Sequence, residues 1–212
     1  MTNEHPLPDG NMRYSLFEAW LSNKQTAMQR YFKPEEEREH FENKWMLYGS
    51  LVARTLEQRP LPDWINIACK TKEGVDVPLV YDVNEYRIIH EIDGYMIRGS
   101  IDTYSHNLHK FADHKAVKAK WSQNKVNAHK QLAYYSVLIE QANEWVDDEC
   151  HIICIPVDCD ENDIVRLTGE PALAIPRVVT KDERDAMKQL MVDTARDISI
   201  VYQSYLNGYI TL

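Results

Sequence analysis

The residues best suited to chemistry in this sequence are two aspartates and one lysine. Asp102 ends the apolar run GSID, and Asp113 and Lys115 stand in the run FADHKAV. Side chains alternate between the two faces of a strand, so Asp113 and Lys115 point one way and His114 points the other. If the two runs pair as a hairpin, both carboxylates and the ammonium group converge. The pattern therefore predicts one polar site on two neighbouring strands.

This set of groups suits a divalent metal ion and a water molecule. Two nearby carboxylates raise each other's pKa, and a bound cation reverses that penalty. Mg²⁺ and Mn²⁺ prefer carboxylate and carbonyl oxygens together with water. Such an ion activates water and stabilises charge on a phosphate, and Lys115 beside it would neutralise developing charge. Phosphodiester hydrolysis is the reaction that the set serves best; the alternative is a solvated hairpin that merely alternates Asp and Lys.

The elements that position these residues are expected to be strands in the middle of the chain, with helices on both sides. Period-two alternation predicts strands over 77–81, 86–92, 95–104 and 110–117, then 150–157, 163–167 and 173–175. Asp93-Gly94 predicts a two-residue hairpin turn. Apolar periodicity and capping residues predict helices from Ser15 to Phe32, over 34–58, from Ser122 over 123–144, and from the Thr180–Glu183 capping box onward. The fold class expected is α/β (α+β), with a central mixed, mainly antiparallel sheet flanked by helices.

Composition sets the outer limits of the function. The chain has 212 residues, 44% hydrophobic and 27% charged, which fits one soluble globular domain. Its organisation is predicted as a helical lead-in over 1–60, a catalytic core over 75–180 and a C-terminal helix over 181–212. The net charge of −9 excludes a uniformly basic nucleic-acid-binding surface but not a local basic patch. No apolar run approaches membrane-spanning length and the polar N-terminus does not resemble a signal, so we expect a cytoplasmic protein without membrane contact.

Two further features extend the site beyond the hairpin. Gln131 and Tyr135 stand four residues apart, so both lie on one face of the helix that follows the strands. Gly49 lies in the middle of a predicted helix, where glycine costs about 1 kcal/mol relative to alanine. It indicates either close packing of another element or close approach by the substrate or the acid-bearing hairpin.

Taken together, these motifs resemble the PD-(D/E)XK nuclease superfamily. GSID ending at Asp102, DHK over 113–115 and QLAYY over 131–135 match its acid, acid-x-lysine and QxxxY motifs, closest to the RecB-like and phage exonuclease branch. The helix GSLVARTLE over 49–57 and the lead-in RYSLFEAWLSNKQTAMQRYF are similar to the helical segments of that branch. The resemblance covers roughly residues 13–140 and implies a restriction-endonuclease-like core.

Carried onto this sequence, the resemblance implies a role for each matching residue. Asp102 and Asp113 would bind Mg²⁺ or Mn²⁺ together with the backbone carbonyl of His114. Lys115 would act on the attacking water, and Gln131 would support the site or the scissile phosphate. Tyr135 would lie near the DNA. Gly49 and Glu57 are expected to support the site.

One position departs from the family pattern. Ala53 stands where most RecB-like members have a metal-binding histidine. The resemblance implies a metal-dependent DNA nuclease, an exonuclease acting at DNA ends in recombination or repair rather than an endonuclease, similar to phage-encoded members. The alternative, motivated by Ala53, is a catalytically impaired module that binds DNA or a protein partner in a regulatory role. Phage-type relatives also imply a recombination or annealing protein as partner, an oligomer, and the host cytoplasm as location.

Several other residues stand close to these motifs in the sequence. Lysines are concentrated between 110 and 130, where Asp113 is the single acid, and Lys118, Lys120 and Lys125 are candidates for binding DNA phosphates or for a solvated helix start. Trp121 is expected to pack rather than to stack on a base. His129 is placed about 200° from Gln131 on an ideal helix, so it is not expected in the site.

The four cysteines raise the question of a cofactor. Some RecB-like nucleases hold an iron–sulfur cluster on one upstream and three downstream cysteines. Here Cys150 and Cys154 would share a face of one strand, and Cys69 follows the Gly49 helix rather than preceding it. Reduced core thiols are therefore expected, and no iron–sulfur cluster.

Overall fold

The computed structural model describes residues 6–33, 37, 49, 68–78, 82–143, 145–160 and 165–212. Its helices are a 3₁₀ turn η1 (Pro8–Gly10), α1 (Tyr14–Ser22), α2 (Lys24–Tyr31), α4 (Gln123–Asn127), α5 (Lys130–Asn143) and α6 (Lys181–Leu206). Its strands are β1 (Met12–Arg13), β2 (Cys69–Lys70), β3 (Val83–Ile92), β4 (Tyr95–Ser105), β5 (Lys110–Val117), β6 (Glu149–Cys159), β7 (Val165–Leu167) and β8 (Ala172–Val178).

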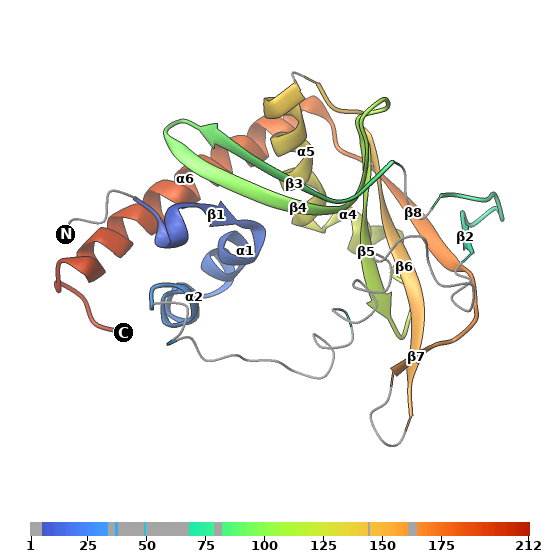
Figure 1. The fold of residues 1–212 in the computed structure, drawn as a ribbon, viewed down its shortest axis with the longest axis horizontal. Helices are drawn as coiled ribbons and strands as arrows, with labels where there is room; N and C mark the ends of the chain where they lie inside the picture. The colour runs from blue at the N-terminus through green and yellow to red at the C-terminus, as the bar shows by residue number, and fades with distance from the viewer. Residues whose placement is uncertain are drawn as a thin grey trace.

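These strands form one mixed sheet with eight members among the described residues. Its main path runs β1-β4-β5-β6-β8-β2, with β3 added to β4 and β7 added to β6. The β3–β4, β4–β5, β6–β7 and β6–β8 pairs are antiparallel, whereas the β1–β4, β5–β6 and β2–β8 pairs are parallel. The long β3–β4 hairpin curves away from the other strands (Figure 1). The predicted fold class, α/β with a mainly antiparallel mixed sheet, is confirmed.

The turn between β3 and β4 follows directly from its two residues. Asp93 and Gly94 have φ values of 49° and 82°, and Ile92 pairs with Tyr95 across the turn. Aspartate and glycine tolerate positive φ, which a two-residue hairpin of this kind requires. The turn sets the register of the hairpin, and with it the position of Asp102 on β4.

The alternation of faces along β4 changes at Asp102. Ile97 and Ile101 lie in the main core, as alternation requires, but Tyr104 lies in the same core although it is three residues beyond Ile101. The register pairs on either side leave Glu85 of β3 opposite Asp102, and Glu85 has a φ of 48°. A left-handed residue inside a strand is a local distortion, and such irregularities redirect side chains. The irregularity falls at the first of the predicted acids.

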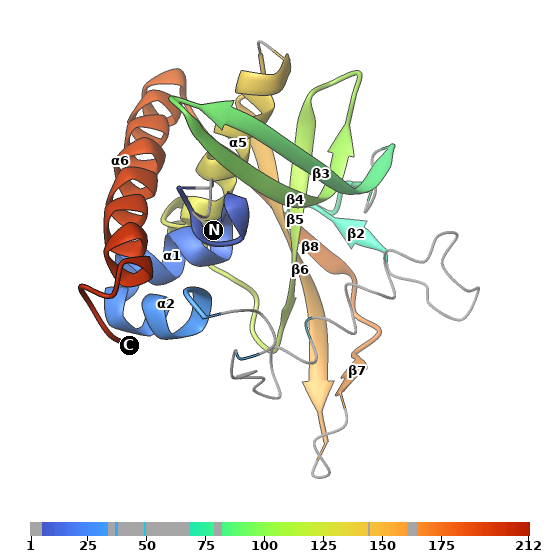
Figure 2. The same cartoon turned by 60° about the vertical axis from the view of Figure 1, so that its left-hand side comes forward.

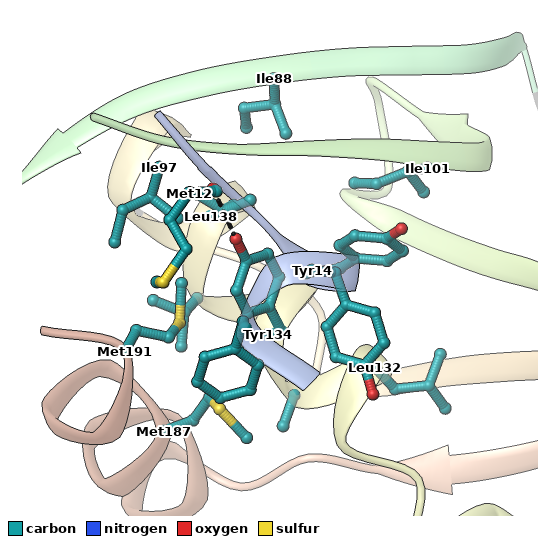
Figure 3. Packing of buried hydrophobic residues seen from close by; sticks show 14 of the residues in the cluster. Met12, Tyr14, Ile88, Ile97, Ile101, Leu132, Tyr134, Leu138, Met187 and Met191 are labelled. Carbon is teal, nitrogen blue, oxygen red and sulfur yellow. Dashed lines mark hydrogen bonds between the residues drawn. The ribbon is translucent and has the colours of Figure 1, made fainter. Parts of the chain in front are cut away.

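The core lies between one face of the sheet and a layer of helices. Helices α5 and α6 pack on each other and on the β3–β4 hairpin, and α1 packs on α6 (Figures 1 and 2). Tyr134 of α5 is buried at the centre and donates a hydrogen bond of 3.0 Å from its hydroxyl to the carbonyl of Met12 (Figure 3). A smaller cluster fills the opposite face of β5, β6 and β8, and contains Cys69, Ala112, Ile153, Ile155, Ala172 and Ala174. β6 thus contributes alternate residues to two cores, as a central strand buried on both faces does.

Several predicted elements differ from the structure. α1 begins at Tyr14 with Arg13 as its N-cap, so Ser15 is inside the first turn and does not cap the helix. The strand expected over 77–81 is not formed at Val77 and Pro78, where the backbone of Val77 bonds to Cys69 instead. Residues 79–81 and the helix predicted over 34–58 lie outside the described residues, apart from Glu37 and Gly49.

The long helix predicted after Ser122 is divided in two. Ser122 caps α4 as expected, because its Oγ accepts a hydrogen bond from the backbone N–H of Lys125. α4 ends at Asn127 and α5 begins at Lys130. In the interruption the carbonyl of His129 accepts a hydrogen bond from the guanidinium of Arg177 on β8. This tertiary bond takes a carbonyl that a continuous helix would use, and the apolar periodicity of the sequence does not reveal it.

The C-terminal helix begins where the sequence predicts. Thr180 and Glu183 form the predicted capping box at the start of α6. Within the described part of the chain, no helix has the length and apolar character needed to cross a membrane.

Candidate active site

The first predicted acid, Asp102, lies where the backbone pairing between β4 and β5 ends; we call this place the seam. The backbone pairing of the two strands runs from Ser105↔Lys110 to Thr103↔Ala112 and is not continued at Asp102. The Asp102 side chain crosses the seam at this point, and its Oδ2 accepts a hydrogen bond of 2.5 Å from the backbone N–H of His114. Asp102 thus bonds to the backbone of the residue between Asp113 and Lys115.

Asp113 and Lys115 lie together on the helix-facing side of β5. Asp113 is 2% exposed, and its Oδ2 lies 2.7 Å from Nζ of Lys115. The contact is an ion pair without the angles of a directional hydrogen bond. Oδ2 accepts no directional hydrogen bond from any described residue. The Lys115 ammonium is the only cation that the structure places at this buried oxygen among the described residues, and its charge compensates the carboxylate.

Gln131, in the first turn of α5, connects the ion pair to the helix. Its Oε1 accepts a hydrogen bond of 2.9 Å from Nζ of Lys115, and its Nε2 donates one of 2.8 Å to the hydroxyl of Tyr135. The i,i+4 spacing predicted from the sequence places both side chains on the face of α5 that meets β5. The amide orientation is therefore determined at both ends.

Tyr135 is a buried support behind Gln131. It is 4% exposed, and its ring lies against Phe111 and beside the backbone of Gly99 on β4. Burial first, and then the negative charge of Asp113, raise the pKa of Tyr135, so its hydroxyl stays protonated at neutral pH. In the structure the buried ring is placed to hold Gln131, and the expected position of Tyr135 near DNA stays a prediction.

The electrostatics of the site keep Lys115 charged. Burial works to lower the pKa of Lys115, but the carboxylates of Asp113, Asp102 and Glu18 outweigh burial and raise it. A charged lysine is an electrostatic partner for a phosphate or a bound hydroxide rather than a proton acceptor at neutral pH. This agrees with the predicted use of Lys115 to neutralise developing charge.

His129 is part of this site, contrary to the interpretation of the sequence. Its Nε2 lies 3.1 Å from Oε1 of Gln131. Since that oxygen is an acceptor, Nε2 must carry the proton for the hydrogen bond to form. The angle of about 200° between His129 and Gln131 assumes one continuous helix. α5 begins only at Lys130, so His129 lies outside the helix and the angle does not apply. Burial and the positive charge of Lys115 lower the pKa of His129.

Tyr14 and Glu18, one turn apart on α1, are a second group that the sequence interpretation did not find. The hydroxyl of Tyr14 donates a hydrogen bond of 3.2 Å to Glu18, and the Tyr14 ring packs near the rings of His129 and Tyr135. Glu18 contributes to the raised pKa of Lys115. No local signal marks Glu18, because only the packing of α1 against α5 brings it close to the strands.

The predicted lysines lie beside this site on the segment after β5. Lys118, Lys120 and Lys125 are exposed, but Lys120 lies 3.6 Å from the Glu170 carboxylate and Nζ of Lys125 lies 3.9 Å from the centre of the Trp121 ring. Trp121 is partly buried against the main core and meets His129 edge-on, as expected of a packing aromatic. Binding of phosphates by these lysines stays a prediction.

The remaining predicted residues are described only in part. Gly49 is helical, and a Cβ added to it would meet no described atom within 4 Å beyond its chain neighbours and the backbone of its own helix. Ala53 and Glu57 lie outside the described residues. Cys69, Cys150 and Cys154 are buried free thiols, and burial raises the pKa of Cys69 to about 11 and that of Cys150 to about 12.

The donor set fits a hard divalent ion at the seam. Asp113 offers a buried oxygen without a hydrogen bond, and the Asp102 carboxylate lies at the backbone of the neighbouring residue. Oxygen donors of this kind suit Mg²⁺ or Mn²⁺, which keep several waters. Within the described ranges, no three His, Cys, Asp or Glu side chains are grouped closely enough to hold a metal by themselves. Any ion at this place would therefore depend on backbone oxygen and water as well.

Comparison with known proteins identifies a solved structure with a similar fold. No family model and no curated protein matches the chain. Among solved structures, an exonuclease candidate from Eubacterium rectale is similar with a TM-score of 0.53 and 12% identity, over 95% of this chain and 83% of that one. A phage-related exonuclease from Haemophilus somnus 129PT aligns with a TM-score of 0.49 and 13% identity, over 83% of this chain and 78% of that one. The likeness to the first of these structures shows that this chain shares its fold.

Proposed function

We propose that this chain is a metal-dependent deoxyribonuclease that hydrolyses phosphodiester bonds, and that it acts as an exonuclease at DNA ends. The observation that carries the proposal is the buried Asp113 carboxylate, paired with Lys115 and left with an oxygen that accepts no hydrogen bond among the described residues. Its place beside Asp102, on a fold similar to that of an exonuclease candidate, supports a hydrolytic site.

The residues would divide the work according to their charges. Asp102, Asp113 and the carbonyl of His114 would hold Mg²⁺ or Mn²⁺, which supplies Lewis acidity toward the phosphate and the attacking water when bound. Lys115, kept charged by its neighbours, would hold the attacking water and balance negative charge that develops at the phosphorus. Gln131 would keep the Lys115 ammonium in place through the hydrogen bond of 2.9 Å. Tyr135 would fix the Gln131 amide from behind.

A second candidate function is a nuclease-fold module that binds DNA or a protein without turnover. It is favoured by the small donor set, in which the described residues offer two close carboxylates but no third His, Cys, Asp or Glu ligand. Ala53, at the position where the resemblance leads one to expect a histidine, points the same way. This candidate expects binding in Mg²⁺ and Mn²⁺ with no cleavage product in either.

One set of reactions tests both candidates. Linear, circular and end-blocked DNA would be incubated with Mg²⁺, Mn²⁺ or EDTA, using the natural chain and Lys115→Ala. The proposal expects metal-dependent loss of linear DNA alone, reduced by roughly a thousandfold in the variant. Degradation that continues unchanged in Lys115→Ala would reject the assignment of the site. Cleavage of circular DNA would instead replace exonuclease by endonuclease action.

A further inference from the structure

The outer face of the β3–β4 hairpin carries a second group of polar side chains, away from the helix layer. Gly99 points toward α5, where an added Cβ would meet Tyr135 and Leu138 at 3.0 Å. By alternation, Arg98 and Ser100 point to the opposite face, and both are exposed. The register places Ile89 opposite Arg98 and Arg87 opposite Ser100, so Arg87 and Ile89 share this outer face.

The same face continues onto a third strand. β1 pairs with β4 in parallel, and Arg13 is the register partner of Arg98. Arginines therefore stand on three neighbouring strands, β1, β4 and β3, in a chain whose net charge is −9. Such a local reversal of sign concentrates the positive field over a small area. We call Arg13, Arg87, Arg98 and Ser100 the hairpin arginine face.

The three arginines differ in how they are compensated. The Arg13 guanidinium lies 3.0 Å from Asp9 and 5.6 Å from the centre of the Tyr31 ring on α2, so it already contacts the helix layer. Arg87 lies 3.3 Å from Glu85 in an ion pair exposed to solvent. Across the described part of the chain, the Arg98 guanidinium takes part in no hydrogen bond or ion pair. Glu91 shares this face, but it stands opposite Met96 nearer the hairpin turn. Arg98 is therefore the cation with donors available to an incoming anion.

Arg98 also borders a hollow in the surface. A cavity of about 400 Å³ is lined by Arg87, Ile88, Ile89, Arg98, Gly99 and Ser100. Two guanidinium groups, one hydroxyl and the exposed side chain of Ile89 thus surround a space large enough for part of a nucleotide. Guanidinium groups bind phosphate oxygens through two parallel N–H donors, and Ser100 adds an O–H donor.

We propose that the hairpin arginine face binds the sugar–phosphate backbone of DNA outside the catalytic centre, with Arg98 as its main phosphate contact; this rests on the proposed nuclease function. Ser100 and Arg98 precede Asp102 on β4 by two and four residues, which corresponds to about 7 and 13 Å along the strand. This outer face is on the side of the sheet away from α5, whereas Asp113 and Lys115 are on the side that meets α5, so a strand bound here would be anchored without entering the catalytic centre. A polymer is favoured over a small phosphate because the donors are spread over three strands.

The test compares Arg98→Ala with two matched variants of the full chain. Arg98→Lys keeps the charge at the same place, and Arg196→Ala removes an exposed arginine from the Arg196–Asp193 pair of α6. Binding of fluorescein-labelled single-stranded and duplex DNA would be followed by anisotropy in EDTA over a series of salt concentrations. Hydrolysis kinetics in Mg²⁺ would supply KM and kcat for the same variants.

For Arg98→Ala we expect binding that is about tenfold weaker. The slope of log K against log salt should become shallower by about 0.7 on single strands or 0.9 on duplex. KM should rise while kcat stays unchanged. Arg98→Lys keeps the charge but not the paired donors, so it should keep the salt slope with a smaller loss of affinity, and Arg196→Ala should behave like the natural chain. Whichever DNA form shows the larger loss identifies the strand that the face holds.

The outcomes separate this proposal from the proposed function. If the natural chain cleaves DNA and Arg98→Ala has the same affinity, salt slope and KM, the hairpin arginine face is rejected while the nuclease assignment stands. If the chain binds DNA through Arg98 but never cleaves it, the face is supported and the catalytic assignment fails. A chain that neither binds nor cleaves DNA overturns both.

Discussion

Two clusters of charged side chains meet helix α5, and they differ in how completely their polar atoms are bonded. Where α5 packs on α6, Arg184 donates from Nε to Glu140 at 3.0 Å, and from Nη1 to Asp148 at 2.6 Å and to the carbonyl of Val179 at 2.5 Å. At the start of α5, Lys115 pairs with Asp113, whose buried Oδ2 accepts no directional hydrogen bond within the described residues. The polar atoms of Arg184 are bonded to several partners, whereas the buried oxygen of Asp113 has the Lys115 ion pair alone among the described residues.

Charge state does not distinguish the two clusters. Burial works to lower the pKa of both Arg184 and Lys115, and neighbouring carboxylates outweigh burial and raise it in each case. Both cations therefore stay charged at neutral pH. What separates the clusters is the number of directional hydrogen bonds: several hold Arg184 between the helices, whereas Oδ2 of Asp113 accepts none among the described residues and is compensated by the charge of Lys115.

The largest effect is expected for Asp113→Asn, which changes the cluster at the seam with little change in shape. Turnover on linear DNA should fall by roughly a thousandfold, because the proposed metal loses a charged ligand. Stabilisation of the folded chain by Mn²⁺ should disappear as well, as measured by thermal unfolding with and without the ion. Stabilisation by Mn²⁺ that equals that of the natural chain would show that the ion binds elsewhere.

Arg184→Met is the corresponding change where α5 packs on α6. It leaves Glu140 without its hydrogen-bonded partner and the Val179 carbonyl without a donor. The free energy of unfolding should fall by about 1–3 kcal/mol, because the Val179 carbonyl loses its donor while among the described residues Glu140 keeps only the Lys181 ion pair at 3.5 Å. Denaturant unfolding measures this change, and turnover per folded molecule should remain that of the natural chain. A loss of turnover without a loss of stability would contradict the division between the two clusters.

Gly99→Ala tests the packing behind the site. The added Cβ would lie 3.0 Å from a Leu138 methyl group and 3.0–3.1 Å from the Tyr135 ring, closer than ordinary contacts. We expect a loss of about 1–2 kcal/mol in stability from overpacking, together with lower turnover as Tyr135 and Gln131 shift. Ser136→Ala is the matched control on the same helix, since its buried hydroxyl has no hydrogen-bond partner among the described residues and its removal should not destabilise the chain.

The sequence carries the parts of this structure that depend on local periodicity. The strands over 95–104 and 110–117, the Asp93-Gly94 turn and the Thr180–Glu183 capping box are found where the residues predict them. Two local periods, two along β5 and 3.6 along α5, also place Asp113 with Lys115 and Gln131 with Tyr135 on shared faces of their own elements. These features require only the chain near each residue.

The parts that the sequence interpretation missed depend on contacts between distant segments. α4 and α5 are separate because Arg177 of β8 binds the carbonyl of His129, 48 residues away along the chain. Glu18 reaches the neighbourhood of Lys115 only because α1 packs against α5. Such contacts leave no periodic signal in one sequence, so His129 and Glu18 could be assigned only from the structure.

The smallest expected effect concerns His129, which shares Oε1 of Gln131 with Lys115. Burial and Lys115 lower its pKa in the folded chain below the ordinary value of about 6.5. As the pH falls below that value, the unfolded chain takes up a proton that the folded chain resists, so the free energy of unfolding decreases. His151, whose pKa burial also lowers, adds a decrease of the same sign. The natural chain should therefore lose stability below about pH 6.5.

His129→Gln separates the two histidines, because glutamine keeps an N–H donor for Gln131 but does not titrate. Denaturant unfolding above and below about pH 6.5 should show a smaller loss of stability in this variant than in the natural chain. The remaining loss then belongs to His151 and to the carboxylates. If the two chains differ by the same amount at every pH, His129 is not a buried neutral histidine in the folded protein. The Gln131 amide would then depend on Lys115 and Tyr135 alone for its orientation.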